Sequence, residues 1–409
     1  MHRSGLLGVW WLLAGCNGNS TRCPDGLIER ADGACVPEEE GGNGAEADID
    51  TDTDADTDTD TDADADTDTD ADPEFDVCAE GAPFTRIQDA IDAAGDGDEV
   101  MVCGGTYQEN VVISDKSIRL IGFLGSERTA IDGTNTAPAL AVLEGAGFGT
   151  LISGFTLRNG VADAVDGYSG GYGGGLLIRN ANPTVEDVVV RDSLAANGGG
   201  VAMVNSNGVI DGVTVTDSDA EEHGGGIFVS GGDPTIRHAL VERCFSVDGG
   251  SGLYATLTGL QLYNSIFYRN TGSTASPGVL VENGESADFY NLIVSYNEAS
   301  GASGDVCALD ARSGTAVYNS IAFVNDGIGM CTGNNASHNL SFANDQDFLR
   351  SPGETDLNDD PAFARASDGN FILQPQSIAI DGGLPDPQFN DPDGSRADLG
   401  AYGGPFGEW

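Results

Sequence analysis

The chain has 409 residues, with 66 aspartates and glutamates against 17 lysines and arginines, so its formal net charge is −49. A surface this acidic repels phosphate backbones and anionic lipid headgroups, which rules against nucleic-acid binding and against docking of a basic face on a membrane. The 60 glycines follow no Gly-X-Y period, which excludes a collagen helix and fits a chain with many tight turns.

The N-terminus has the features of an export signal. Arg3 is followed by an apolar run from Leu6 to Leu13 that is too short to span a bilayer. The run ends in Leu-Ala-Gly-Cys at residues 13–16, which resembles the lipobox of bacterial lipoproteins. The resemblance implies that residues 1–15 are a signal peptide and that a lipid on Cys16 anchors the chain in a membrane. The alternative is a plain secretory signal with a cysteine at this place by chance.

This resemblance also implies a location in the bacterial envelope, at the outer membrane or the cell surface, on the extracytoplasmic side. Residues 16–40 then form a lipidated N-terminal segment, in which Cys23 and Cys35 bracket a small Gly/Asp-rich loop and are predicted to pair. Residues 41–73 alternate Asp with Thr or Ala. They have no apolar face and their aspartates repel one another, so we expect a disordered, charge-extended linker. Loose calcium binding by these aspartates is an open alternative.

The folded part is expected to begin at residue 74. Ile87, Ala90, Ile91 and Ala94 have the spacing of an amphipathic helix. The stretch IQDAIDAA, followed by GDGDEVMVCGGTYQENVVI, resembles the N-terminal cap of pectate-lyase-like parallel β-helix proteins, in which a helix plugs the open end of the coil. Cys78 and Cys103 flank this segment and are predicted to form a disulfide.

A seven-residue segment then recurs with a period of about 26 residues. Its copies begin at Ser153, Glu186, Asp211, His238, Asn264, Asn291 and Asn319. Apolar residues alternate within each copy, as at Val188 and Val190, and glycine triplets open a second short strand. The pattern predicts an all-β fold, a right-handed parallel β-helix solenoid over residues 74–345, whose turns stack at about 4.8 Å.

The residue that ends each copy predicts a ladder of stacked polar side chains inside the coil. These residues are Asn159, Asp192, Asp217, Cys244, Asn270, Asn297 and Asn325. We interpret the ladder as structural, weakened in the turns that lack asparagine. Cys307 and Cys331 lie one repeat apart and predict a bridge between turns, which leaves Cys244 as a buried thiol. A zinc site is the competing interpretation, but no CxxC pair or histidine cluster supports it.

Residues 346–409 end in NDPDGSRADLGAYGGP, at positions 390–405, which resembles the closing segment of surface-exposed bacterial β-helix proteins. The resemblance implies that this segment covers the last turn. Ser377 is followed by Ile where that family has Pro, and Gly403 replaces an acid. Asp391, Asp393 and Asp398 surround Gly394 and are candidate calcium ligands, calcium being the one cofactor that the sequence suggests. The alternative is an Asx-type turn in which Arg396 pairs with one acid.

The loops after the repeated segment supply the candidate catalytic residues. They are Asp192, Asp217, Asp219, Glu222, His223 and Arg243, with Asp163, Asp166, Glu221 and Arg191 expected nearby. Such a cluster fits a calcium-assisted lyase with an arginine base, or a hydrolase with two carboxyl groups. The competing interpretation is a set of solvated turn acids.

Two functions therefore stay open, and whether the chain is an enzyme is part of that choice. The preferred one is a lipid-anchored surface protein that binds polysaccharide or surface partners in an adhesive or structural role, because no catalytic signature is evident. The alternative is an extracellular polysaccharide lyase or glycoside hydrolase acting on uronate-type glycans. Under either, exposed aromatic rings would stack on sugars, and the candidates are Tyr168, Tyr172, Tyr268 and Tyr296.

Overall fold

The computed structural model describes residues 75–163, 169–273, 276–284, 286–300, 305–312 and 314–407, together with the backbone of two short strands nearer the N-terminus. These strands, β1 (Leu27–Glu29) and β2 (Cys35–Pro37), pair antiparallel within a unit of residues 1–68, separate from the unit of residues 69–409. The signal peptide, Cys16, the Cys23–Cys35 pairing and the linker lie outside the described residues. Within the described ranges, no helix has the length and apolar character needed to cross a bilayer.

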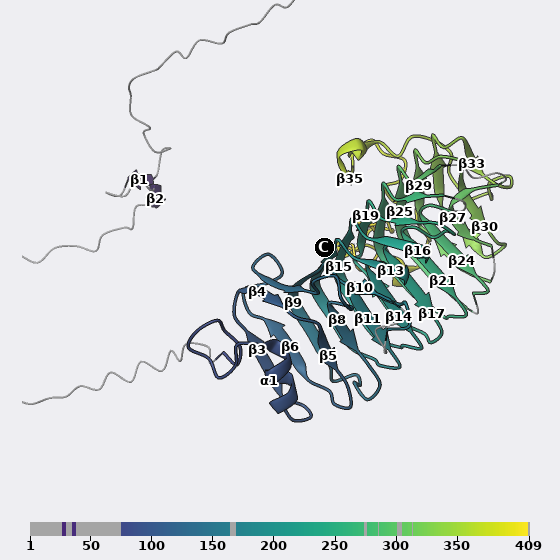
Figure 1. The fold of residues 1–409 in the computed structure, drawn as a ribbon. Coiled ribbons are helices and arrows are strands. Elements are labelled where there is room, and N and C mark those ends of the chain that lie inside the picture. The colour runs from purple at the N-terminus through teal and green to yellow at the C-terminus, as the bar shows by residue number, and fades with distance from the viewer. Residues whose placement is uncertain are drawn as a thin grey trace, which may run out of the picture. The chain divides into compact units, whose positions relative to one another are not determined.

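The second unit is a parallel β-helix, which confirms the predicted fold class (Figure 1). Its largest sheet, here the β9 sheet, has 15 strands. They are β3 (Glu99–Val102), β4 (Gly105–Gln108), β6 (Arg119–Gly122), β7 (Thr129–Asp132), β9 (Leu151–Arg158), β12 (Thr184–Arg191), β15 (Val209–Thr216), β18 (Thr235–Arg237), β19 (Leu240–Glu242), β22 (Gln261–Tyr268), β25 (Asp288–Ser295), β28 (Ala316–Tyr318), β29 (Ile321–Phe323), β31 (Ala336–Ser337) and β32 (Leu340–Phe342).

Two further parallel sheets complete each turn. The β11 sheet has 10 strands and the β13 sheet has 6. The β11 sheet contains β5 (Val111–Ile113), β8 (Leu140–Val142), β11 (Leu176–Arg179), β14 (Val201–Val204), β17 (Ile227–Ser230), β21 (Leu253–Thr256), β24 (Val279–Glu282), β27 (Cys307–Ala311), β30 (Ile328–Thr332) and β33 (Gln346–Phe348). The β13 sheet contains β10 (Val161–Ala162), β13 (Leu194–Asn197), β16 (Asp219–His223), β20 (Phe245–Ser246), β23 (Thr271–Gly272) and β26 (Glu298–Ala299).

Stacked apolar side chains fill the coil between these sheets. In the β9 sheet, Val188 pairs with Phe155 in the turn before and with Val213 in the turn after, and all three are buried. Because the side chains of a strand alternate between its two faces, every second residue of each strand points into the coil and stacks on its counterparts in the neighbouring turns. No single turn could bury these side chains alone, so the turns stabilise one another by stacking.

The helix α1 (Ile87–Ala93) covers the first turn, as predicted (Figure 1). Its two ends are satisfied by side chains from that turn. The buried carboxylate of Glu109 accepts hydrogen bonds from the backbone N–H groups of Ile87 (2.8 Å) and Gln88 (3.1 Å). At the other end, Lys116 donates to the carbonyl oxygens of Ile91 and Ala94. Opposite charges at the two ends suit the helix dipole and hold the helix over the coil.

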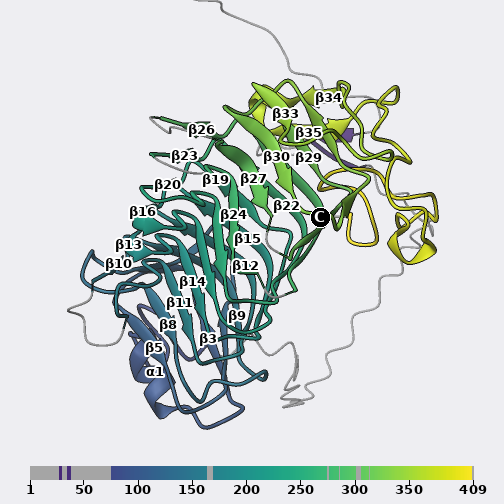
Figure 2. The same ribbon diagram turned by 90° about the vertical axis from the view of Figure 1, so that its right-hand side faces the viewer.

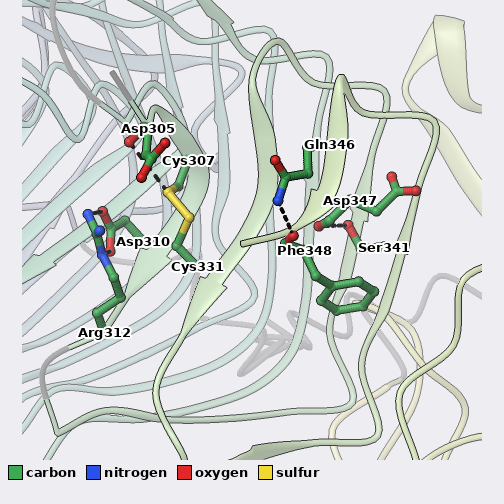
Figure 3. Close-up of a disulfide and its surroundings, with 9 residues drawn as sticks. All are labelled: Asp305, Cys307, Asp310, Arg312, Cys331, Ser341, Gln346, Asp347 and Phe348. Carbon is green, nitrogen blue, oxygen red and sulfur yellow. Dashed lines mark hydrogen bonds and ion pairs between the residues drawn. A yellow bond between two sulfur atoms is a disulfide. The ribbon is translucent and has the colours of Figure 1, made fainter. Parts of the chain in front are cut away.

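Both disulfides predicted for the described residues are present. Cys78–Cys103 ties the segment before α1 to the first strand of the coil. Cys307–Cys331 joins β27 to β30 in the neighbouring turn, next to the ion pair of Asp310 and Arg312 (Figure 3). Cys244 is a free, buried thiol.

A ladder of asparagine side chains runs through consecutive turns inside the coil. Nδ2 of Asn270 donates to Oδ1 of Asn297 at 3.1 Å, and Asn297 donates in the same way to Asn325 at 3.0 Å. Asn325 continues the ladder to Asn344 at 2.9 Å. The same oxygens accept backbone N–H groups, as from Asn270 to Asn297 at 2.9 Å. The predicted ladder is therefore confirmed in the later turns.

In the earlier turns the ladder position was predicted one residue too early. Strand register defines the ladder row as Gly160, Ser193, Ser218, Cys244, Asn270, Asn297, Asn325 and Asn344. The row before it, here the corner row, is Asn159, Asp192, Asp217, Arg243, Arg269, Tyr296, Val324 and Ala343, with φ between 48° and 62°. Asn and Asp tolerate this left-handed conformation better than most residues, which is why Asp192 and Asp217 resembled ladder residues.

The C-terminal segment covers the last turn at Leu357, which forms a bridge with Leu340 of β32, and it then packs along the outer face of the β9 sheet (Figure 2). It contains the antiparallel pair β34 (Phe363–Arg365) and β35 (Asn370–Leu373) and the short 3₁₀ helices η1 (Ala366–Asp368) and η2 (Pro387–Phe389). Asn264 donates to the carbonyl oxygens of Ala401 and Gly403, and Asn291 to those of Asp398 and Gly400. Outward side chains of four turns are buried beneath it, namely Ile266, Ile293, Ile321 and Leu340.

Candidate functional site

Three of the predicted catalytic residues stack in the corner row, where the β9 sheet turns into the β13 sheet. Asp192, Asp217 and Arg243 occupy this position in successive turns. Nε and Nη2 of Arg243 each lie 3.0 Å from an oxygen of Asp217, so the pair is bidentate. Asp192 pairs with its neighbour Arg191. The acids of this corner are therefore largely engaged by arginines.

The ion pair between Asp217 and Arg243 favours the charged form of both side chains. Hydrogen bonds from Arg243 lower the pKa of Asp217, which keeps the carboxylate ionised. The same contact raises the pKa of Arg243 above its usual range, so the guanidinium has no free lone pair to accept a proton. A lyase base must first lose its own proton, and the ion pair with Asp217 opposes that loss at Arg243, so a role of Arg243 as a base stays a prediction from the sequence.

Asp219 differs from its neighbours in the corner. It is the first residue of β16 and its side chain points out of the coil, between Leu194 and Phe245 of the adjacent turns. Burial raises the pKa of Asp219, and the negative charge of Asp217 raises it further. Two carboxyl groups whose pKa values are pushed apart can divide the roles of acid and base.

Glu222 and His223 lie at the other end of β16, so the structure does not bring the six candidates together. Asp219 and Glu222 are three positions apart along an extended strand, a distance of about 10 Å. An oxygen of Glu222 accepts a hydrogen bond from Nδ2 of Asn197 at 2.9 Å. The ring of His223 packs against Tyr254, with ring centroids 4.3 Å apart.

Glu222 instead belongs to a surface pocket of about 500 Å³, here called the Tyr172 pocket. It lies on the outside of the β13 sheet and is lined by Val161, Ala162, Asp163, Gly170, Gly171, Tyr172, Leu194, Ala195, Ala196, Asn197, Glu221 and Glu222. Tyr172 forms a β-bridge with Asn197 of the next turn, which places the phenol ring and the amide side by side. The pocket therefore combines an aromatic ring, an amide and carboxylates.

Neighbouring side chains hold the two central residues of the Tyr172 pocket. The ring of Tyr172 packs against Phe228, with centroids 5.4 Å apart, and the guanidinium of Arg179 lies 5.8 Å from its centroid. Asn197 is only 9% exposed, and its amide is oriented by Glu222. Sequence reasoning named Tyr172 and Glu222 but missed Asn197, since it follows no recognisable motif.

The other aromatic candidates do not form an exposed platform. Tyr268 was predicted to be exposed, but it is buried under the C-terminal segment, where its hydroxyl donates to Ser367 and its ring meets Phe371 edge to face. Tyr296 is half-buried against Tyr268 and Phe323. Tyr168 and Asp166 lie outside the described residues.

The carboxylate oxygens of all three candidate calcium ligands accept hydrogen bonds from backbone N–H groups. Asp391 accepts from the N–H groups of Asp398 and Gly404, and Asp393 accepts from that of Ser395 in an Asx-type turn. Burial raises the pKa of Asp391 to about 6. Arg396 donates to the carbonyl oxygens of Gly382 and Gly383, and not to an acid as the Asx-turn alternative supposed.

Across the ranges that the structure describes, no group of three or more His, Cys, Asp or Glu side chains is arranged to hold a metal ion. A calcium ion at Asp391, Asp393 and Asp398 therefore stays a prediction from the sequence. Binding there would have to compete with the hydrogen bonds that these carboxylates already accept.

No protein-family model and no curated protein matches this chain. Among solved structures, the pectate lyase Pel9A aligns with 11% identity and a TM-score of 0.43, over 78% of this chain and 91% of its own. A structure described as ORF18 of Geobacillus virus E2 has 17% identity and a TM-score of 0.35, over 64% of this chain and 58% of its own. A pectin methylesterase from Yersinia enterocolitica has 11% identity and a TM-score of 0.32, over 68% and 94%. Similarity at this level says nothing about chemistry.

Proposed function

We propose that this chain is a polysaccharide-binding protein of the bacterial cell surface, with the Tyr172 pocket as its sugar-binding site. One observation carries the proposal, namely that the ring of Tyr172 and the amide of Asn197 share one pocket with the carboxylates of Glu221 and Glu222. A sugar has a C–H face that packs on an aromatic ring, and hydroxyl groups that bond to amides and carboxylates. A volume of about 500 Å³ lies within the range of small-ligand sites.

The surface location rests on the N-terminal sequence. A lipid on Cys16 would hold the chain in the membrane, and the acidic linker of residues 41–73 would extend the β-helix away from it. The linker could reach on the order of 100 Å at ~3.3 Å per residue. Such a tether suits a protein that captures or organises extracellular glycans.

Glycan binding by the mature chain tests the proposal. A Cys16→Ser variant, which cannot be lipidated, is screened on a panel of soluble neutral, cationic and anionic oligosaccharides by calorimetry. We expect Tyr172→Ala to weaken binding at least about tenfold, because the variant loses the stacking ring. The matched control is Phe148→Ala, which removes another exposed aromatic ring (71% exposed) that does not line the pocket. Equal binding by the wild type and Tyr172→Ala would reject the Tyr172 pocket as the site.

A second candidate function is that of an extracellular polysaccharide lyase or glycoside hydrolase, and Asp219 is the observation that favours it. Its raised pKa beside the ionised Asp217 has the pattern of a carboxyl pair with divided roles. Reducing-sugar release and absorbance near 235 nm, measured on pectins, alginates and neutral glycans, test this function. Product formation that disappears in Asp219→Asn and persists in Tyr172→Ala would establish an enzyme with its site at the corner row.

A further inference from the structure

We propose that the Tyr172 pocket selects glycans that carry free amino groups, and that it excludes the uronate polymers considered from sequence. This inference rests on the proposed function, because it names the class of sugar taken by the same site. It depends on the combination of one aromatic ring, that of Tyr172, with lining residues whose charged side chains are all carboxylates.

The charged side chains that line the pocket are all acidic. Asp163, Glu221 and Glu222 contribute carboxylates, and among the described residues that line the pocket there is no lysine, arginine or histidine. Glu221 and Glu222 take part in none of the ion pairs found among the described residues. A uronate would place its own carboxylate in this field, where like charges repel.

The nearest arginines do not reverse this charge. Arg179 lies over the ring of Tyr172 but donates to the carbonyl oxygen of Ser169, outside the lining of the pocket. Arg191 is paired with Asp192 in the corner row. The charge of Arg191 is balanced by Asp192, and the three carboxylates of the lining outnumber the single positive charge of Arg179.

The acceptors in the pocket suit an ammonium group in particular. Asn197 donates its amide hydrogen to Glu222, which fixes the position of that carboxylate while leaving its other acceptor positions open to a ligand. An ammonium group brings three donors and a positive charge, and its hydrogen bonds to carboxylates are stronger than those of a hydroxyl. A neutral sugar could make the stacking contact but not the charge-assisted one.

The test compares three short glycans of similar size on the mature Cys16→Ser chain, namely the trimers of glucosamine, N-acetylglucosamine and galacturonic acid. Binding is measured by calorimetry at about pH 6, where the amino groups carry a proton, at low and at moderate salt. We expect the glucosamine trimer to bind at least about tenfold more tightly than the N-acetylated trimer, and the galacturonate trimer to bind most weakly. Added salt should reduce the difference in affinity between the glucosamine trimer and the N-acetylated trimer.

Variants separate a pocket effect from the acidity of the whole surface. Glu221→Gln/Glu222→Gln should remove most of the preference for the amino trimer, whereas Glu186→Gln, an exposed glutamate on the outer face of β12, should leave it unchanged. Equal affinity for the three trimers, or tighter binding of galacturonate, would overturn this inference and leave the proposed function standing. A preference that survives Glu221→Gln/Glu222→Gln would also overturn it. If none of the trimers binds, or if Tyr172→Ala binds them all as the wild type does, the proposed site itself fails.

Discussion

Nδ1 of His238 lies 2.6 Å from Oδ1 of Asp211, and on the other side of the ring Nε2 lies 2.9 Å from the carbonyl oxygen of Phe406. A carboxylate and a carbonyl oxygen can only accept, so the imidazole donates to both only when both of its nitrogens carry protons. Arg237 strengthens the contact, since its Nε donates to Asp211 at 2.8 Å and its guanidinium lies 5.3 Å from the centroid of the Phe406 ring. These residues fasten the end of the C-terminal segment to the coil.

Replacing this carboxylate should loosen the end of the chain in a pH-dependent way. Burial by itself would raise the pKa of Asp211, but hydrogen bonds from Arg237 and His238 outweigh it and lower the pKa. A carboxyl group whose pKa is lowered in the folded state stabilises the fold at pH values above its pKa in the unfolded chain, about 3.9. This stabilisation is lost as the pH falls through the pKa of the folded state. We expect Asp211→Asn to reduce the free energy of unfolding by about 1 kcal/mol at neutral pH and by much less below about pH 3.

Thermal melts at several pH values check this expectation, with Asp248→Asn as the control. Asp248 is an exposed aspartate of the neighbouring turn and should give the wild-type curve. A difference between Asp211→Asn and the wild type that stays constant from neutral to acidic pH would contradict the assignment, because the lost stability would then not depend on ionisation.

The asparagine ladder predicts a large effect of a single buried side chain. Asn297 donates to Asn325 and to the carbonyl oxygen of Phe267 (2.9 Å), and its oxygen accepts from Asn270. We expect Asn297→Ala to destabilise the protein by about 2–4 kcal/mol, because it leaves several buried groups without partners. Chemical denaturation measures the loss. The exposed Asn334→Ala should stay within about 0.5 kcal/mol of the wild type, and a similar result for Asn297→Ala would mean that the ladder adds no stability.

Much of the coil could be predicted because its signal is repeated and local. Alternating apolar residues such as Val188 and Val190 fix which side of each strand faces inward, and helical spacing at Ile87 and Ile91 marks the cap. The ladder register was harder to predict. Thr216 pairs with Glu242, so the residue aligned with Cys244 in the ladder row is Ser218 and not Asp217. The sequence alone does not distinguish these two neighbours, because the difference lies in the left-handed backbone conformation of Asp217 at the corner.

The Tyr172 pocket and the covering segment could not be predicted because each depends on contacts between distant residues. Tyr172 meets Asn197 through a bridge between a loop and a strand of the next turn. The sequence did contain a sign of the pocket, because the interval between the copies that begin at Ser153 and Glu186 is unusually long. Residues of this interval line the pocket. For the C-terminal segment, the signal was an outward position that is apolar in every turn from Leu240 through Ile266 onward, whereas Thr214 occupies it in the turn before.

The C-terminal segment should open without unfolding the coil. Leu399 is 2% exposed and packs in a cluster with Ile293 and Ile321, separate from the core of the coil. We expect Leu399→Ala to weaken the docking of this segment by about 2–4 kcal/mol. Hydrogen exchange should then speed up at the backbone amides of residues 398–404 and stay unchanged in β12 and β15. The exposed Ile372→Ala (58% exposed) is the control, and faster exchange throughout the coil would contradict independent docking.

Cys244 provides a reporter that separates opening of the C-terminal segment from unfolding of the coil. Its thiol is buried in the ladder row, and burial raises its pKa to about 12. Burial therefore opposes formation of the thiolate, and only the thiolate reacts with an alkylating reagent. We therefore expect mass spectrometry to find Cys244 unmodified in the native protein and modified at the rate of global unfolding. Leu399→Ala should not accelerate this labelling, whereas Asn297→Ala should, because only the ladder variant destabilises the turns around Cys244. Rapid labelling in the wild type would mean that these turns open on their own, which would contradict the mutual stabilisation of stacked turns.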